Sequence, residues 1–427
     1  MRTLDTIFAL SSGRPPAAVG LIRISGPQAH AAASRIAGDL PVPRVASVRE
    51  LRDPATDELL DQALVLRFNG PASATGEDVV EFHCHGGRAV VEVVLSRLAA
   101  IDGLRQARPG EFTRRAFESG RIDLSEAEGL ADLLEAETES QRKAALAIAE
   151  GGLRRQIEQW QARLLELSAI AELAIDYDDV DEALDPEFIA SCDALASDLE
   201  QWLCRPRVEP LKDGLLIVVA GPPNAGKSSL VNLVAGEERS IVTDVPGTTR
   251  DHIEVPLSIA GIPVRLTDTA GLRAAEDEPE AIGVERARSL LKIADIVVWL
   301  GAATEAPVHP RLVLVHAKAD LAGREEVPAG MIPVSALTGA GVAALLERLA
   351  ELAGTILPGE GAIALNRRQA DLIGAAQRSL RAAACATELS ILAEELRHAR
   401  SAFDRLTGRA GVENVLDALF ARFCLGK

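Results

Sequence analysis

Residues 215–228 read LLIVVAGPPNAGKS, an apolar run that ends in Gly221-x-x-x-x-Gly226-Lys227-Ser228. The run predicts a buried strand, and an apolar helix is expected to start near Ser229. Glycines in the connecting loop let backbone N–H groups face phosphates, and the helix N-terminus favours an anion. Lys227 can reach the β and γ oxygens of a nucleotide, and Ser228 can ligate magnesium. The stretch therefore predicts a phosphate loop in a mainly parallel α/β sheet.

Two later motifs add groups for the phosphates and for magnesium. A predicted strand at 264–267 leads to Asp268-Thr269-Ala270-Gly271, where the Asp268 carboxylate can meet the magnesium shell and the Gly271 amide can sense a γ-phosphate. Between the two lies Pro246-Gly247-Thr248-Thr249-Arg250-Asp251, whose hydroxyls suit a second magnesium contact, at Thr249. An Asp after a strand is more often a cap or turn residue, so neither motif alone indicates a nucleotide site. Together and in this order, the motifs indicate one strongly.

A third motif predicts the base. Ala317-Lys318-Ala319-Asp320 follows a predicted strand at 312–315 and offers a carboxylate for the two N–H donors of guanine and a lysine stem to cover the ring. Ser335-Ala336-Leu337 would complete the base pocket through its backbone. The sequence therefore predicts a GTPase. The residues expected to contact the nucleotide are Asn224, Ala225, Gly226, Lys227, Ser228, Ser229, Thr243, Thr248, Thr249, Asp268, Gly271, Lys318, Asp320, Ser335 and Ala336.

Length and composition predict two to four domains in a cytoplasmic protein. The chain has 427 residues, 48% of them hydrophobic, and five cysteines without a repeated spacing. Neither a signal peptide nor an apolar run of about 18 residues occurs, so no membrane segment is expected. The formal charge of −18 opposes non-specific attraction to phosphate backbones, so nucleic-acid binding would need a local basic patch or a basic partner.

The pattern along the chain predicts a multidomain α/β protein. We expect an α+β domain over 1–118, a mostly helical domain in two parts (119–209 and 358–427), and an α/β domain inserted between those parts at 210–357. The first helical part is expected to form two long helices, with a break at Asp185-Pro186-Glu187. The acidic run from Glu172 to Glu200 could be a metal or partner site, but such runs are more often a solvated face.

Several motifs extend beyond those shared by many GTPases. They are Gly20-Leu21-Ile22-Arg23-Ile24-Ser25-Gly26, Arg108-Pro109-Gly110-Glu111-Phe112, Asp244-x-x-Gly247-Thr248-Thr249-Arg250-Asp251 and Phe423-Cys424-Leu425-Gly426-Lys427. With the insertion inside helices, they make the chain resemble the MnmE (TrmE) tRNA-modification GTPases over essentially its whole length. The resemblance implies a folate-binding amino-terminal domain that dimerises, a helical domain and an inserted GTPase domain.

The resemblance also implies a role and a set of folate contacts. Such proteins act with the flavoprotein MnmG on the wobble uridine of certain tRNAs, at carbon 5, and use 5-formyl- or methylene-tetrahydrofolate as one-carbon donor and GTP hydrolysis. Matched by position, Arg23, Glu81, Arg121 and Lys427 look like folate contacts, although residue 121 is Arg where Lys is expected. Cys424 matches the family's terminal cysteine and is a candidate catalytic residue. Ordinary surface charge, and for Cys424 a half-buried structural thiol, remain the alternatives.

The chain departs from the usual guanine motif at Ala317, where Asn is normal. That Asn side chain usually ties the base loop to the phosphate loop. We therefore expect looser nucleotide binding, with the preference for guanine kept by Asp320.

The residue after the Asp-x-x-Gly motif predicts a cation-assisted reaction. It is Leu272, which can neither orient water nor supply charge. Asn224 and carbonyls of the loop 243–248 are oxygen ligands that suit a monovalent cation. The resemblance implies potassium held by Asn224, Thr243, Val245 and Thr248 when two GTPase domains meet, with Glu280 positioning the water. Lys227, Asn224 and Glu280 are thus the predicted catalytic residues of hydrolysis, and the alternative for Asn224 is a brace within the loop.

Other readings stay open. A GTPase of ribosome assembly, or a folate-binding scaffold switched by GTP, would share several of these motifs. His83 and His85 lie on one face of a predicted strand, but two ligands do not make a metal site, and none is predicted there.

Overall fold

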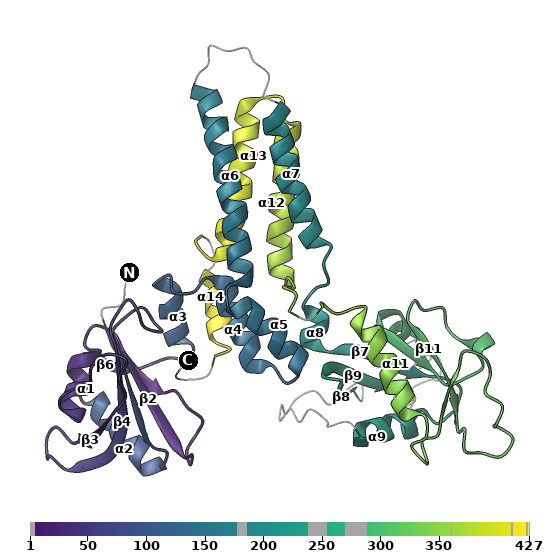
Figure 1. Ribbon diagram of the computed structural model, residues 1–427, viewed down its shortest axis with the longest axis horizontal. Coiled ribbons are helices and arrows are strands. Elements are labelled where there is room, and N and C mark those ends of the chain that lie inside the picture. Colours follow the sequence, from purple (N-terminus) through teal and green to yellow (C-terminus); the bar gives the residue numbers. More distant parts are fainter. Residues whose placement is uncertain are drawn as a thin grey trace, which may run out of the picture. The chain divides into compact units, whose positions relative to one another are not determined.

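The computed structural model describes residues 5–176, 186–237, 254–269, 288–359, 361–410, 413–423 and 426 (Figure 1). The chain divides into two compact units. Unit 1 comprises Met1–Ala131, Leu153–Gln161 and Ser401–Lys427, and unit 2 comprises Asp132–Gly152 and Ala162–Arg400.

Unit 1 contains a six-stranded sheet in the order β3 (Ser47–Arg52), β4 (Leu59–Phe68), β5 (Val79–His85), β2 (Val19–Ser25), β1 (Thr6–Leu10) and β6 (Leu104–Gln106). Neighbouring strands are antiparallel, except that β1 and β6 are parallel. The amino-terminal α+β fold is therefore as predicted.

One face of this sheet is covered by helices. Alternate residues of β2 and β5, among them Ile22 and Phe82, are fully buried. They pack in one cluster with α1 (Ala29–Ala37) and α2 (Arg88–Ala99). Because side chains alternate across a strand, the residues between them, including Arg23 and Glu81, lie on the other face, called here the open face.

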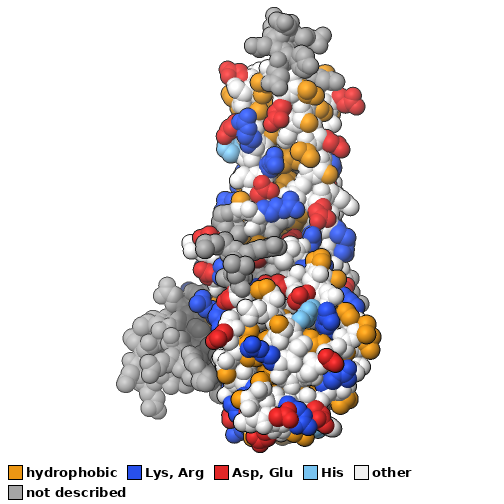
Figure 2. All heavy atoms as spheres, turned by 90° about the vertical axis from the view of Figure 1, so that its left-hand side faces the viewer, with side chains coloured by type: hydrophobic (Ala, Val, Ile, Leu, Met, Phe, Trp, Pro, Cys, Tyr) orange, Lys and Arg blue, Asp and Glu red, His pale blue; other side chains and the backbone are white. Residues whose placement is uncertain are grey.

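The other helices of unit 1 form a smaller core. They are α3 (Glu111–Glu118), most of α4 (Leu124–Glu135), part of α6 (Gly152–Asp176), the end of α13 (Leu389–Thr407) and α14 (Glu413–Phe420). Leu124, Leu419 and Phe420 pack together, and Trp160 stacks on Phe403 with ring centroids 6.0 Å apart. On the face shown in Figure 2, basic and acidic side chains are interspersed.

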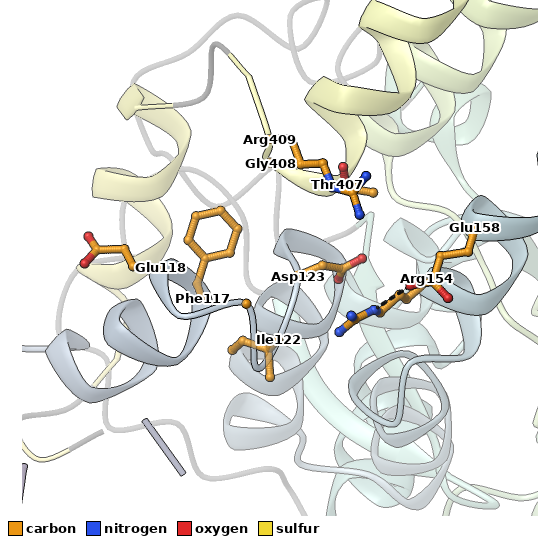
Figure 3. Close-up of a pocket in the computed structure, with 10 residues that line it drawn as sticks. Phe117, Glu118, Ile122, Asp123, Arg154, Glu158, Thr407, Gly408 and Arg409 are labelled. Carbon is orange, nitrogen blue, oxygen red and sulfur yellow. Dashed lines mark hydrogen bonds and ion pairs between the residues drawn. The ribbon is translucent and has the colours of Figure 1, made fainter. Parts of the chain in front are cut away.

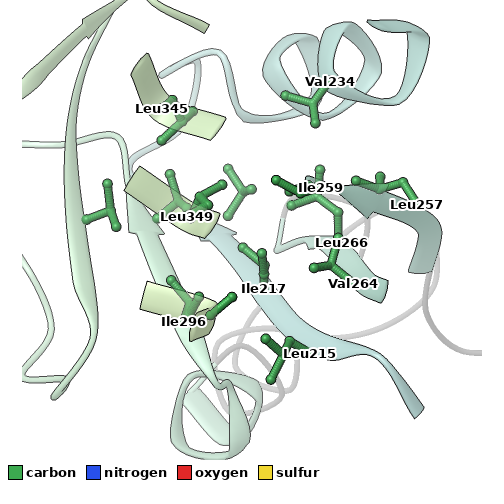
Figure 4. Packing of buried hydrophobic residues seen from close by; sticks show 14 of the residues in the cluster. Leu215, Ile217, Val234, Leu257, Ile259, Val264, Leu266, Ile296, Leu345 and Leu349 are labelled. Atoms are coloured by element: carbon green, nitrogen blue, oxygen red, sulfur yellow. The ribbon is translucent and has the colours of Figure 1, made fainter. Parts of the chain in front are cut away.

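Unit 2 holds the second sheet, in the order β12 (Ile332–Val334), β11 (Leu312–Ala317), β10 (Ile296–Trp299), β7 (Leu215–Ala220), β9 (Ile262–Asp268) and β8 (Glu254–Ile259). All neighbours are parallel except β8 and β9. Every residue of β7 is buried. Figure 4 shows Leu345 and Leu349 of α11 (Val342–Gly354) packed over Ile217 and Ile296. The mainly parallel α/β sheet is as predicted.

The remaining elements of unit 2 are mostly helical. They are the end of α4, α5 (Glu139–Ala149), the larger part of α6, α7 (Pro186–Leu203), α8 (Glu209–Asp213), α9 (Lys227–Glu237), the 3₁₀ turn η2 (Ala303–Glu305), α12 (Arg367–Cys385) and most of α13. Arg381 of α12 pairs with Asp193 of α7 at 2.7 Å. None of the helices within the described ranges is long and apolar enough to cross a membrane.

The expectation of two long helices over 124–203 is wrong, because this stretch forms α4, α5, α6 and α7. A new helix begins after Thr138, whose side chain and that of Gln141 form a capping box. Another begins after Gly151, which has φ +77°. Only the start of α7 at Pro186 agrees with the expected break.

Candidate functional site

The loop between β7 and α9 turns tightly. Asn224 has φ +60° and Gly226 has φ +101°, and both values fall in the left-handed region. The helix α9 then begins at Lys227. Its first backbone N–H groups therefore face the loop, which is the arrangement that binds phosphate in nucleotide-binding folds.

Lys227 lies inside this loop, with only 8% of its surface exposed. Its Nζ donates hydrogen bonds to the carbonyl oxygens of Gly221, at 3.1 Å, and Pro222, at 2.9 Å. These bonds fold the ammonium group back over the loop, where it can interact with phosphate oxygens.

The structure brings together Ser228 and Asp268, two of the three residues predicted to contact magnesium. Asp268 ends β9, next to Val219 of β7, because the two strands are parallel and in register. Ser228 Oγ donates a hydrogen bond to Asp268 Oδ2. Thr269 is tied to the same strand through its backbone N and Oγ1, which both donate to the Val219 carbonyl at 3.2 Å. Ser228 and Asp268 thus present oxygen atoms at one point beside the phosphate loop, as a hard cation requires.

The two predicted base-binding loops also lie side by side. Ala317 at the end of β11 is in register with Val334 of β12, and the Ala319 backbone N donates to the Val334 carbonyl at 3.2 Å. Lys318 has φ +57°, and its Cε is 3.8 Å from the position that a Cβ on Gly226 would take. Ser335 is buried and accepts a hydrogen bond from the Thr338 backbone N. Asp320 is exposed. The base loop and the phosphate loop are therefore neighbours.

Several predicted site residues lie outside the described residues. They are Thr243, Val245, Thr248, Thr249, Gly271, Glu280, Cys424 and Lys427.

Two of the predicted folate contacts form an ion pair on the open face of the unit 1 sheet. Arg23 of β2 stands directly opposite Glu81 of β5. Glu81 Oε1 accepts from Arg23 Nε at 2.9 Å and lies 2.8 Å from Nη2. The guanidinium also lies 5.6 Å from the centroid of the Phe112 ring. Arg121 is exposed after α3, near Gly76, and among the described contacts it bonds to neither residue of the pair.

The two histidines of β5 have different partners. His83 Nε2 lies 3.5 Å from Glu81 Oε2. His85 Nδ1 lies 2.7 Å from Asp61 Oδ1, and the His85 backbone N donates to Asp61 Oδ2. Among the described residues no group of three potential metal ligands occurs. Pairing between Asp61 and His85 was not predicted, because it depends on how β4 and β5 align.

Unit 1 also contains a cavity of about 320 Å³ that the sequence did not indicate (Figure 3). Asp123, Arg154 and Glu158 are among its lining residues, and Arg154 bonds to Glu158 at 3.0 Å. Asp123 Oδ1 accepts from Ser125 Oγ and the Glu126 backbone N, whereas Oδ2 is buried without a partner in the described part of the chain. Burial raises the pKa of Asp123. Residues 117 to 123 were predicted only as the junction of two domains.

Comparisons with known proteins cover almost the whole chain. A family described as "MnmE helical domain" matches residues 124–424, and one described as "GTP-binding protein TrmE N-terminus" matches residues 6–121. A protein of Novosphingobium aromaticivorans named "tRNA modification GTPase MnmE" is 49% identical over 99% of this chain and 100% of its own length. Proteins of the same name from Erythrobacter litoralis (51% identical) and Zymomonas mobilis (49% identical) also match over 99% of this chain and 100% of theirs.

Among solved structures, the G domain of the T. maritima FeoB iron transporter matches 33% of this chain and 98% of that domain, with 23% identity and a TM-score of 0.25. The family matches and the full-length relatives suffice for an assignment, and the resemblance seen in the sequence motifs is confirmed. The chain belongs to the MnmE family of tRNA modification GTPases.

Proposed function

We propose that this chain hydrolyses GTP and that the hydrolysis serves the modification of the wobble uridine of tRNA, at carbon 5, to a 5-carboxymethylaminomethyl-type base. The GTPase part of this proposal is supported by the position of Lys227, Ser228 and Asp268, whose side chains lie together at the phosphate loop. The tRNA part rests on the family and on the printed names of its members.

The phosphate loop can stabilise the charge that develops during phosphoryl transfer. Backbone N–H groups at the start of α9 and the Lys227 ammonium supply positive charge beside the β and γ phosphates. Asp320 would accept from the two N–H donors of guanine, while the Lys318 stem covers the ring. The chain's part in catalysis is then mostly positioning and electrostatic stabilisation.

Two cations would bind near this loop. Ser228 and Asp268, with Thr249, would hold a magnesium ion, which neutralises charge on the β and γ oxygens when bound. Asn224 sits at the tight turn of the loop, and with Thr243, Val245 and Thr248 it would hold a potassium ion. Glu280 would position the attacking water.

The open face of unit 1 would take the folate. Arg23 and Glu81, which pair directly, with Arg121 and Lys427, would bind 5-formyl- or methylene-tetrahydrofolate in a homodimer. Cys424 is the candidate residue for chemistry on the one-carbon unit. The flavoprotein MnmG would be the partner for the reaction on tRNA.

The test is nucleoside analysis of tRNA from cells that lack this chain, complemented by the wild type or by Lys227→Ala. Deletion should remove the modified wobble uridine, the wild type should restore it, and Lys227→Ala should not, since it cannot support hydrolysis. Modified uridine that persists in the deletion strain would overturn the assignment. Purified wild type should also hydrolyse GTP, which separates loss of the GTPase from loss of the tRNA role.

A further inference from the structure

The base loop, residues 318–324, follows β11 and carries Lys318 and Asp320. Asp320 is exposed, so its carboxylate is accessible to a base. The last residue of β11 is Ala317, whose methyl group cannot form a hydrogen bond to the phosphate loop. The position of Asp320 therefore depends on the contacts that the base loop makes elsewhere.

His316 ties the base loop to the sheet of unit 2. It lies on β11 and is only 8% exposed. Because side chains alternate along a strand, His316 lies on the face opposite Val315, which packs in one core with α11. His316 Nε2 lies 3.0 Å from the carbonyl oxygen of Arg324, at the end of the loop. At the start of the loop, the Ala319 backbone N donates to the Val334 carbonyl at 3.2 Å.

Both ring nitrogens of His316 face Arg324. Arg324 Nη2 lies 3.5 Å from Nδ1, and since a guanidinium can only donate, Nδ1 accepts. Nε2 then carries the ring proton and donates to the Arg324 carbonyl, which can only accept. The two contacts fix the imidazole and the end of the loop relative to each other.

Two turns connect Arg324 to Asp320. The Arg324 backbone N donates to the Leu321 carbonyl, and the Leu321 backbone N donates to the Lys318 carbonyl, both at 3.1 Å. A displacement of Arg324 therefore moves the segment that carries Asp320.

We propose that His316 is a positioning residue of the base site. By holding the Arg324 carbonyl, it keeps the base loop in the conformation in which Asp320 accepts from the two N–H donors of guanine. With Ala at position 317, this bond takes the place of a bond from the loop to the phosphate loop. His316 is buried and acts through Asp320 rather than on the nucleotide itself. The inference rests on the proposed base site and adds the residue that orients it.

Guanine and adenine nucleotides separate a positioning role from a general loss of stability. Adenine lacks the two N–H donors, so the binding of ATP does not use Asp320. Positioning predicts a preference for GTP over ATP that depends on His316. Damage to the fold predicts an equal loss for both nucleotides.

The experiment is titration of the purified full-length chain with a fluorescent guanine nucleotide, with GTP and ATP as competitors. His316→Leu should weaken GTP about tenfold, the value of one hydrogen bond, and leave ATP nearly unchanged. His316→Gln, which retains an N–H donor, should keep most of the preference. His309→Leu is the matched control, because His309 Nε2 also bonds to a carbonyl, that of Ala294 at 3.0 Å. Ala294 precedes β10, at the end of the strands away from the phosphate loop, so this variant should keep the preference.

A double-mutant cycle tests whether His316 acts through Asp320. His316→Leu should weaken GTP about tenfold in the wild type but hardly at all in Asp320→Ala, where the carboxylate to be positioned is already absent. The kcat at saturating GTP should stay unchanged in His316→Leu, because the phosphate site is intact.

The outcomes separate this inference from the proposed base site. A wild type that prefers GTP would overturn the role of His316 alone if His316→Leu keeps that preference, loses both nucleotides equally, or weakens GTP as much in Asp320→Ala. A wild type without a preference would overturn the base site and this inference with it. Circular dichroism establishes that each variant is folded. If His316→Leu is unfolded, His316→Asn, whose side chain is too short to reach the Arg324 carbonyl, carries the same prediction.

Discussion

We expect Ala317 to lower nucleotide affinity without changing the choice of base. Its backbone ends β11 next to the phosphate loop, and Lys318 comes close to Gly226. An Asn at 317 could bond to that loop. We therefore expect Ala317→Asn to tighten GTP and GDP binding about fivefold, the value of one net hydrogen bond.

Titration with a fluorescent guanine nucleotide measures this effect, with ATP as competitor. Asp320→Ala is the control and should lose the preference for GTP over ATP. Equal affinity of the wild type for the two nucleotides would contradict the assignment of the base site.

Asp123 predicts a dependence of stability on pH. Burial raises its pKa above the ordinary 3.8, so the folded chain holds this proton to higher pH than the unfolded chain does. Its contribution to stability is then present below the unfolded pKa and is lost as the pH rises through the raised value. Asp123→Asn keeps an oxygen to accept from Ser125 and Glu126 but carries no charge. The variant should therefore gain stability relative to the wild type as the pH rises.

Urea unfolding of both chains from about pH 4 to about pH 8 tests the sign of this difference. Asp53 serves as an opposite control: the hydrogen bond from the Ala55 backbone N lowers its pKa. The contribution of Asp53 is present above its unfolded pKa and is lost as the pH falls, so Asp53→Asn should destabilise more at high pH. Parallel curves for the wild type and Asp123→Asn would show that the charge of Asp123 has no effect.

For single residues, the sequence predicts those that belong to local motifs. It misses those whose role depends on a partner far away in the sequence. Lys227 and Ser228 follow from the phosphate-loop pattern, because that loop needs them at fixed spacing. The pairing of Asp61 with His85 spans 24 residues. Asp123 Oδ2 has no partner in the described part of the chain because of the way the helices cover it. Neither leaves a periodic signal in the sequence.

Among the elements, the turn between β8 and β9 connects α5 to the sheet of unit 2, called here the nucleotide sheet. Ser140 Oγ and its backbone N both donate to the Gly261 carbonyl in that turn, at 2.5 and 3.4 Å. Ala144, one turn further along α5, belongs to the core of the nucleotide sheet. Since β9 ends at Asp268, α5 contacts the opposite end of the strand that carries a predicted magnesium ligand.

Ser140→Ala should therefore destabilise the chain by about 1 kcal/mol, since the Gly261 carbonyl keeps only the longer bond. The matched control is Ser191→Ala, because the exposed Ser191 Oγ donates to a carbonyl within its own helix and its removal should be nearly neutral. Urea denaturation of both variants measures the difference. Equal stability of the two would show that the bond to the turn contributes nothing.

The strands that the sequence predicts are those with strong apolar runs, such as β7 and β11, because burial on both faces leaves a continuous signal. β3 was not predicted, since its alternating exposed residues include charged side chains typical of an edge strand. The helix breaks at Thr138 and Gly151 were also missed. A capping box and a left-handed glycine interrupt a helical pattern without removing its apolar spacing.

On the scale of the whole molecule, charge is unevenly divided. Unit 1 contains as many Lys and Arg as Asp and Glu residues, so the formal net charge of −18 belongs to unit 2. Unit 2 alone therefore repels a phosphate backbone. The net charge of the whole chain does not reveal this difference between the two units. The sequence predicts the classes of the folds, whereas the grouping of α5 with the nucleotide sheet depends on long-range packing.

We expect hydrolysis to depend on potassium when two GTPase domains meet, because the chain lacks a side chain that other GTPases use. Leu272 stands where many GTPases have a glutamine, so another group must supply charge at the β–γ bridge and order the water. Asn224, held at φ +60° in the phosphate loop, would supply an oxygen ligand for a cation there. We expect potassium to accelerate GTP hydrolysis at least tenfold over sodium, because neutralising charge in the transition state has effects of that order or larger.

Asn224→Ala should abolish the difference between the two cations, and Glu280→Ala should slow turnover while nucleotide affinity stays intact. Steady-state rates in matched potassium and sodium buffers, with affinity measured separately, test all three, and equal wild-type rates in the two buffers would refute the cation site.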